Sequence, residues 1–421
     1  MANPDSTKTK SSNEYKYASP TTIFGIYDPL NVNTEGKRIV FTAYGDLYTA
    51  SNCFSASFIQ NFFGSGFITT EMKNDAASKL SETNTIGVDL ASGLWMMMPL
   101  KKNSDNVFIA GVDYNFEESS QFTADLFHLV FFGNYDLQDY TAEISGSKFS
   151  LTSVMEYKVG LLKNFNNNYN TFKLGGTIGL VQGLSGLDIN AKYATLYTAT
   201  DGRYLDLDYD FSIKTSGNAK PSLTSFAGVG FSADLFGQIY LKGPEITINA
   251  MANDLGAVFW TNNPTKIYAD SALRFEGVQV DDLFGATDDA ASGDSDSLLA
   301  ILGVVEETDL FTQALPSRIN LSASKLMSND FYLTIGAQYM LNTPYKPLLF
   351  MQASKAIPSI QMAIGLNAHT GGYGQFNAGL DITKSFGNFI DLRIGSNSLL
   401  GIIASDAFTG VGAYGTISVK L

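Results

Sequence analysis

The strongest constraint on the fold is a strict alternation of apolar and small polar residues near the C-terminus. Over residues 360–385, IQMAIGLNAHTGGYGQFNAGLDITKS, every second side chain is apolar in two runs that are separated by a glycine-rich turn. A period of two is that of a β-strand, so the segment predicts a β-hairpin. One face is wholly apolar, and the other is small and polar with few long charges. The apolar face must meet either a protein core or lipid.

Composition and strand length favour lipid. Charged residues make up 16% of the 421 residues, whereas soluble domains average roughly 25%. Several alternating runs reach about ten residues, the length of a tilted membrane strand. No run of about 18 apolar residues exists, which excludes a transmembrane helix but leaves open a β-barrel, whose strands carry weaker signals.

The connections between the expected strands are short at one end and long at the other. Short Asn-rich or basic turns alternate with longer, more varied segments such as 52–83, 118–147, 183–225 and 261–316. This polarity is typical of outer-membrane barrels, whose short turns are periplasmic. The sequence therefore predicts an all-β fold: a transmembrane, antiparallel, up-and-down β-barrel of about 14 strands. The expected strands lie near 38–51, 84–98, 107–117, 148–162, 172–182, 226–241, 246–260, 317–326, 331–341, 348–356, 360–369, 376–384, 389–397 and 411–421.

Residues 1–36 precede the barrel, which we place at 37–421. The first nineteen residues have the composition of a disordered tail. Residues 20–36, PTTIFGIYDPLNVNTEG, carry enough apolar side chains to form a plug in the lumen. The N-terminus has no apolar core of a signal peptide, so we interpret the chain as a mature form in a Gram-negative outer membrane.

Residues 120–134, within the expected loop 118–147, break the period of two. Thr123 can cap a short helix over about 122–132, Asp125 suits its first turn and Gly133 ends it. The helix is apolar on most sides and must be buried; we expect it to fold into the lumen. It either fills space there or lines a pocket for a hydrophobic ligand with its side chains Phe127, Leu129, Val130, Phe131 and Phe132.

Two pairs of charges are predicted to face the lumen. Glu156 and Lys158 lie opposite an apolar strand face, and so do Asp391 and Arg393. Lumenal charges of this kind pair with each other and hold a plug or loop, or they contact a ligand.

The segment 261–316 is expected to be an acidic extracellular loop with a short helix from about Leu298 to Val305. Its aspartates lack the ligand order of an EF-hand, so solvation is favoured over calcium binding.

Several classes of function are disfavoured. A formal net charge of −14 without a basic stripe argues against nucleic acid as a partner. GVGAYG at 410–415 cannot open a helix, and no G-x-S-x-G motif is present. His128 and His369 lie in no metal-binding spacing, and we interpret His369 as a polar residue at the membrane interface. We expect no cofactor and no enzymatic activity.

The order of several segments is similar to that of an uncharacterised family of outer-membrane barrels. The segments are LFHLVFFGN, SVMEYKVG, GVGFSADL, INAMANDLGAVFW and QALPSRINLSASKLMSNDFYLTIGAQY. That family resembles the long-chain fatty-acid channel FadL and the type IX secretion shuttle PorV. The resemblance implies a fourteen-stranded barrel with an N-terminal lumenal segment. The chain departs from it in lacking the Asn-Pro-Ala type of opening and in ending at Leu421 instead of an aromatic residue.

Two functions remain open. The first is passive uptake or binding of a hydrophobic small molecule by a barrel in outer-membrane lipid. The second is a non-transporting scaffold or shuttle that docks secreted, surface-anchored or other outer-membrane proteins. An outer-membrane lipid hydrolase that uses His369 is a more distant third.

Overall fold

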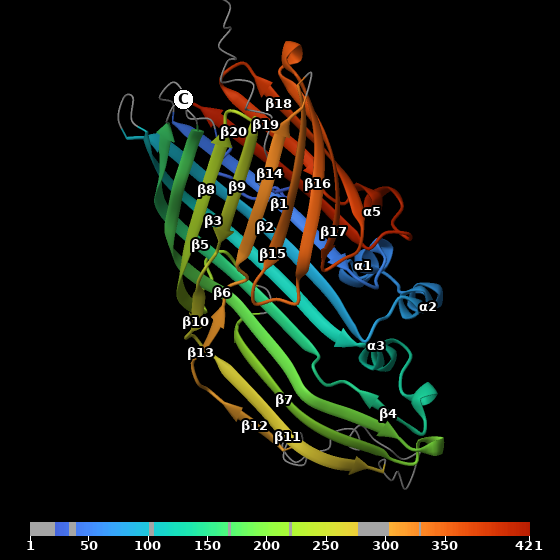
Figure 1. Ribbon diagram of the computed structural model, residues 1–421. Coiled ribbons are helices and arrows are strands. Elements are labelled where there is room, and N and C mark those ends of the chain that lie inside the picture. Colours follow the sequence, from blue (N-terminus) through green and yellow to red (C-terminus); the bar gives the residue numbers. More distant parts are fainter. Residues whose placement is uncertain are drawn as a thin grey trace, which may run out of the picture.

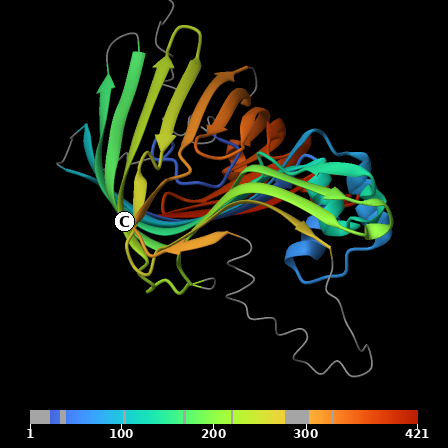
Figure 2. The same cartoon turned by 90° about the horizontal axis from the view of Figure 1, so that it is seen from below.

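The computed structural model describes residues 22–32, 39–100, 105–166, 170–218, 221–276, 303–327 and 330–421. Its strands close into a ring, because the first strand pairs with both the second and the last (Figures 1 and 2). The ring is a closed antiparallel barrel of 14 strands, as predicted.

The wall follows chain order around the ring. Its strands are β1 (Val40–Ser51), β2 (Thr83–Pro99), β3 (Asn106–Thr123), β5 (Lys148–Asn166), β6 (Asn170–Thr198), β8 (Gly228–Leu241), β9 with β10 (Ile246–Asn253 and Ala257–Trp260), β13 with β14 (Phe311–Ala314 and Arg318–Leu326), β15 (Phe331–Met340), β16 (Lys346–Ile357), β17 (Met362–Gly372), β18 (Asn377–Phe386), β19 (Ile390–Ser396) and β20 (Gly410–Lys420).

The outside of the wall is apolar and the inside is polar. On β17, Ile364 and Leu366 point outward and are exposed, whereas Asn367 and His369 point inward and are buried. The same alternation runs along β14 and β16. A closed barrel satisfies its backbone groups within the wall, so an apolar exterior of this kind suits lipid. The apolar face of the 360–385 hairpin therefore faces the membrane. His369 was expected at the interface, but it lies inside the barrel, where its Nε2 is 3.1 Å from the Asn397 carbonyl oxygen.

Part of the wall continues past the barrel at the long-loop end. Beyond Gly183, β6 loses β8 as its neighbour and pairs with β7 (Leu205–Gly217). Next come β11 (Thr265–Phe275) and β12 (Val304–Glu307), while β4 (Tyr140–Glu143) pairs with the end of β6. The expected loop 183–225 is thus largely a sheet extension (Figure 1). Val304 and Val305, expected in a helix, lie in β12; the acidic stretch 277–302 lies outside the described residues.

Helices gather at the same end, away from the C-terminus (Figure 1). They are α1 (Ala56–Phe63), α2 (Thr70–Ser78), α3 (Ala124–Phe131) and α5 (Leu399–Ile403), with short 3-10 turns at Tyr135–Leu137 and Thr200–Gly202. A further 3-10 turn, Pro358–Ile360, lies at the opposite end, in the short connection between β16 and β17. Among the described residues, no helix is both long enough and apolar enough to cross a membrane.

The segment of residues 22–32 lies within the ring of strands (Figure 2); we call it the plug. Ile23 and Phe24 pack near Tyr48 and Tyr345, and Leu30 packs in a second cluster nearer the start of β1. The plug therefore occupies much of the length of the lumen.

Candidate functional site

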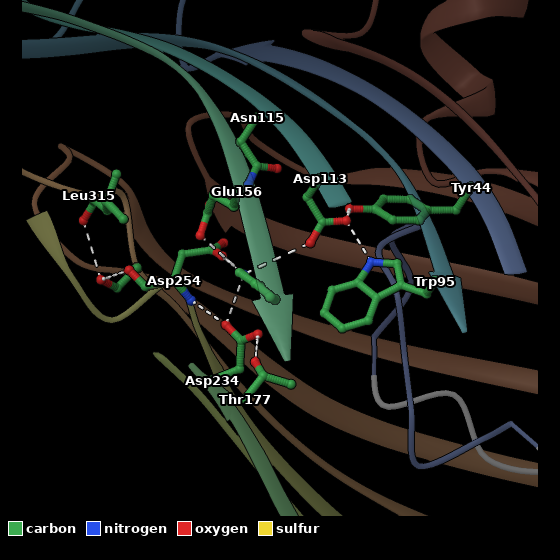
Figure 3. A network of polar contacts seen from close by, with 11 residues as sticks. Tyr44, Trp95, Asp113, Asn115, Glu156, Thr177, Asp234, Asp254 and Leu315 are labelled. Atoms are coloured by element: carbon green, nitrogen blue, oxygen red, sulfur yellow. Dashed lines mark hydrogen bonds and ion pairs between the residues drawn. The ribbon is translucent and has the colours of Figure 1, made fainter. Parts of the chain in front are cut away.

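A buried lysine lies at the centre of a polar network in the lumen (Figure 3). The Lys158 ammonium nitrogen is 2.5 Å from Asp254 Oδ1, 3.0 Å from Asp234 Oδ1 and 3.3 Å from Glu156 Oε2. Asp113 Oδ2 is 3.9 Å away. The lysine side chain is only 2% exposed. The expected pairing of Glu156 with Lys158 is present, but it is one part of a larger cage of carboxylates.

The strand periodicity explains how this cage assembles. Glu156 and Lys158 are two residues apart on β5, so both point inward. Asp113 comes from β3 on one side, and Asp234 comes from β8 two strands away on the other. Asp254 lies in an irregular turn between β9 and β10, where its φ is +60°.

This turn works as a bulge that aims Asp254 into the lumen. Leu255 exchanges both backbone hydrogen bonds with Ala233 of β8, so the wall stays paired on that side. The extra residue lets the Asp254 amide donate to Asp234 Oδ1 at 2.9 Å while its own carboxylate reaches Lys158. Bulges that re-aim one side chain in this way recur next to functional sites.

Aromatic side chains connect the network to the plug. The Trp95 indole donates to Asp113 Oδ1 at 2.6 Å, and the Tyr44 hydroxyl donates to the same oxygen at 2.9 Å. Tyr27 of the plug stacks on Trp95 with ring centroids 4.2 Å apart and planes 11° apart. A shift of the plug would therefore disturb the contacts of Trp95 with Asp113 and, through Asp113, those of Lys158.

A second ion pair lies beside the first group. Arg318 Nη2 is 2.5 Å from Asp89 Oδ1. Asp46 accepts the Gly25 amide of the plug at 3.1 Å, and Glu117 accepts the Tyr373 hydroxyl. Asp46 of β1 thus binds the backbone of the plug, whereas Trp95 of β2 contacts its Tyr27 side chain.

Carboxyl groups outnumber cations in this part of the lumen. Among the described residues, its buried carboxyl groups are Asp46, Asp89, Asp113, Glu117, Glu156 and Asp234, with Asp254 largely buried, and its buried cations are Lys158 and Arg318. Buried charge is costly unless it is paired or hydrogen-bonded, and both cations here already have carboxylate partners.

Asp391 and Arg393 lie near the short-turn end. They were expected to pair with each other, but each has another partner. Arg393 donates from Nε to Asp381 at 2.6 Å, and Asp391 pairs with Lys420 at 2.5 Å. Both face a cavity of about 140 Å³ between the plug and the wall. A smaller cavity of about 30 Å³ lies between Tyr27 and the Lys158 network. Both are below the roughly 300 Å³ of an ordinary ligand pocket.

The aromatic helix predicted from the sequence is α3, and its cap is as predicted. Thr123 Oγ1 accepts the Leu126 amide, Asp125 lies in the first turn, and Gly133 follows with a φ of +82°. Its expected lumenal position is wrong. Phe127, Leu126, Phe131 and Phe132 pack with α1 and α2 beyond the strand ends. Residues 118–123 extend β3 past the barrel, so the helix begins outside the lumen.

The helix residues that were predicted to line a pocket differ in how far they are exposed. Phe127 is 2% exposed, whereas Val130 is 65% exposed. Leu129 lies on the same helix, and its carbonyl accepts the Gly133 amide. Cys53 is buried in this cluster, and burial raises the pKa of its thiol to about 11.

Sequence reasoning missed most of the network. Asp113, Asp234, Asp89 and Arg318 were not singled out, although each occupies an inward position of an alternating strand. That periodicity could have found them. Asp254 could not be found this way, because its direction depends on the bulge.

The fold and the exterior define the protein as a transmembrane β-barrel with a plug segment in its lumen. The chain belongs to DUF5723, a family of unknown function whose model matches residues 41–390. No curated protein matches the sequence.

Similar solved structures include a mutant of the monoaromatic hydrocarbon channel TodX (8% identity, TM-score 0.47, 96% of this chain and 97% of that one). Others are the Ralstonia pickettii toluene transporter TbuX (9%, 0.42, 93% and 91%) and a Pseudomonas aeruginosa FadL homologue (11%, 0.35, 91% and 90%). Likeness at this level carries no inference about what this chain binds.

Proposed function

We propose that the protein is a plugged outer-membrane channel for a small, uncharged and largely apolar molecule. The observation that carries this proposal is how the plug is bound. Its apolar side chains fill pockets in the inner wall that the same kind of molecule would fill if the plug moved. The plug thus occupies the site as a ligand would.

The pockets are aromatic near the long-loop end. Phe24 is 1% exposed and meets Tyr48 edge-on, with ring centroids 5.1 Å apart. Tyr345 and Tyr373 belong to the same cluster, with rings 5.0 Å apart at 90°. Aromatic walls with a few polar groups are typical of pockets for small apolar molecules.

The charge of the lumen narrows the class of solute. An anion on its way past Lys158 would lose its hydration shell, and a buried charge is costly unless it is paired or hydrogen-bonded. The ammonium is already enclosed by Asp113, Glu156, Asp234 and Asp254. These features favour a neutral molecule over one that carries a carboxylate or phosphate.

The plug is held by contacts that can be exchanged. Besides the Gly25 amide on Asp46, Thr22 donates to Gln338 Oε1 at 3.2 Å, and Lys173 donates to the Leu30 carbonyl at 2.6 Å. Burying one large apolar side chain contributes about 1.5–3 kcal/mol. Ordering one residue costs about 1–2 kcal/mol. These opposing effects are similar in size, which is compatible with reversible release.

A single methyl group can test the proposal. A Cβ at Gly25 would lie 2.3 Å from the Tyr414 Cβ, so Gly25→Ala must displace the plug. Gly45→Ala is the matched control, since a Cβ there meets nothing within 4 Å. Each variant is purified from its own outer membrane and examined by native mass spectrometry. We expect Gly25→Ala to carry more bound neutral apolar molecule per barrel than wild type or Gly45→Ala. Equal loading of all three, or loading with anionic lipid only, would contradict the proposal.

The sheet extension supports a second proposed function, that of a scaffold that docks another protein. Within the described ranges, β11 pairs with β12 only over Lys266–Ala269, whereas it pairs with β7 over its whole length. A sheet edge of this kind can accept a strand from another protein. A protein that co-purifies in a one-to-one ratio, and is lost when the extension is shortened, would support this second function.

A further inference from the structure

One stretch of the chain at the long-loop end lacks charge over an unusual length. Between Asp46 and Glu71 the chain has no Asp, Glu, Lys or Arg, although it leaves the barrel there and forms α1 and its following turn. Three phenylalanines at this turn are exposed: Phe62, Phe63 and, at 81%, Phe67. Segments that project into water normally carry charge, so this one needs another environment.

A second uncharged segment packs beside the first. Residues 394–405 contain no charged side chain and include α5. The Ala56 amide donates to the Phe408 carbonyl at 2.7 Å, and the Ser57 amide donates to the Ser405 carbonyl at 3.0 Å. α5 adds two more exposed apolar side chains. We call the five exposed residues of the two segments the apolar rim: Phe62, Phe63, Phe67, Ile402 and Ile403.

The sheet extension at the same end has the opposite character. Lys192 pairs with Asp210, and Arg274 pairs with Asp206, all at least partly exposed. Charged side chains therefore coat the part of this end that projects into water. The contrast between the two parts indicates that the apolar rim meets something other than water.

The apolar rim adjoins the surface that already faces lipid. α5 contacts β18 and β20, and α1 contacts β1. Leu47 on β1 and Phe376 just before β18 are exposed on the outer wall beneath them. In Figure 1, α5 and α1 lie beside the ends of these strands. The lipid-facing belt and the apolar rim are thus neighbouring parts of one apolar surface.

We propose that the apolar rim inserts into the membrane leaflet at the long-loop end and anchors this side of the barrel mouth in lipid. Exposed Phe and other large apolar side chains on one face of a surface helix can enter the boundary between headgroups and acyl chains. The Gly64-Ser65-Gly66 turn places Phe67 at the exposed tip.

Tryptophan fluorescence tests this contact in the full chain. The native Trp95 and Trp260 are both buried, so wild type provides the background. Phe67→Trp is reconstituted into vesicles of ordinary or brominated phosphatidylcholine, since bromine quenches a nearby indole. Leu366→Trp, on the lipid-facing belt, is the positive control. Tyr193→Trp, on the charged extension beside Lys192, is the negative control. Ile403→Trp repeats the test if Phe67→Trp does not fold.

The possible results distinguish a rim that contacts lipid from one that is exposed to water or binds dissolved apolar molecules. We expect brominated lipid to quench Phe67→Trp to an extent similar to Leu366→Trp and far more than Tyr193→Trp. Quenching no greater than that of Tyr193→Trp would overturn the proposal. A rim tryptophan that is unaffected by brominated lipid but shifts when an apolar naphthylamine dye is added would overturn it too, since the apolar rim would then be a capture surface for dissolved molecules.

Discussion

At the scale of single residues, Lys158 is the group on which most of the network depends. Its ammonium lies within 4 Å of four carboxylates, from β3, β5, β8 and the β9–β10 bulge. Removing one partner of a buried charge pair leaves the others uncompensated, which costs far more than the pair itself contributes.

Lys158→Met should therefore lower the free energy of unfolding by roughly 3–5 kcal/mol. Urea unfolding of the folded barrel in detergent measures the change. Lys192→Met is the matched control, because Lys192 also pairs with an aspartate but is 77% exposed, and such surface pairs contribute little. Equal effects of the two substitutions would show that the lumenal cage does not stabilise the barrel.

At the scale of elements, the sheet extension carries ion pairs that are exposed to water. Arg274 donates from Nε and Nη2 to both carboxylate oxygens of Asp206 at 2.7 and 2.8 Å, and these strands pair over residues 205–215 and 265–275. The hydrogen bonds from Arg274 lower the pKa of Asp206 below its ordinary value.

This lowered pKa sets the pH dependence of β7–β11 pairing. A carboxylate with a depressed pKa in the folded state stabilises that state above its unfolded pKa, and the contribution is lost as pH falls through the folded pKa. Hydrogen exchange of the β11 amides, corrected for the intrinsic rate, should therefore quicken as the medium is acidified below the ordinary range of an aspartate. Asp206→Asn should exchange faster at neutral pH and lose this acid dependence; a variant that retains the full pH dependence would disprove the assignment to Asp206.

At the scale of the whole molecule, the membrane explains what the sequence could predict. Lipid outside and a polar lumen inside impose a period of two, so a strand was predicted at each of the fourteen places in the wall. The first part of one interrupted strand, β13, was missed, because Phe311–Ala314 lies in the segment that was expected to be a loop. Beyond Gly183, β6 pairs with β7 outside the barrel, where lipid no longer restricts which residues can face outward. The expected loop 183–225 was wrong there for this reason. Periodicity also gives the side of a strand but not the partner, which is why Arg393 was expected to pair with Asp391 instead of Asp381. The position of α3 depended on contacts with α1 and α2 that are distant in sequence.

We predict that the plug closes the lumen to ions. The most direct test is ion conductance across a planar bilayer for wild type, Gly25→Ala and Gly45→Ala. We predict low conductance for wild type and for Gly45→Ala, and severalfold higher conductance for Gly25→Ala, because only that Cβ must collide with Tyr414. Equal conductance of the three proteins would contradict the claim and leave the barrel without a plug-gated path.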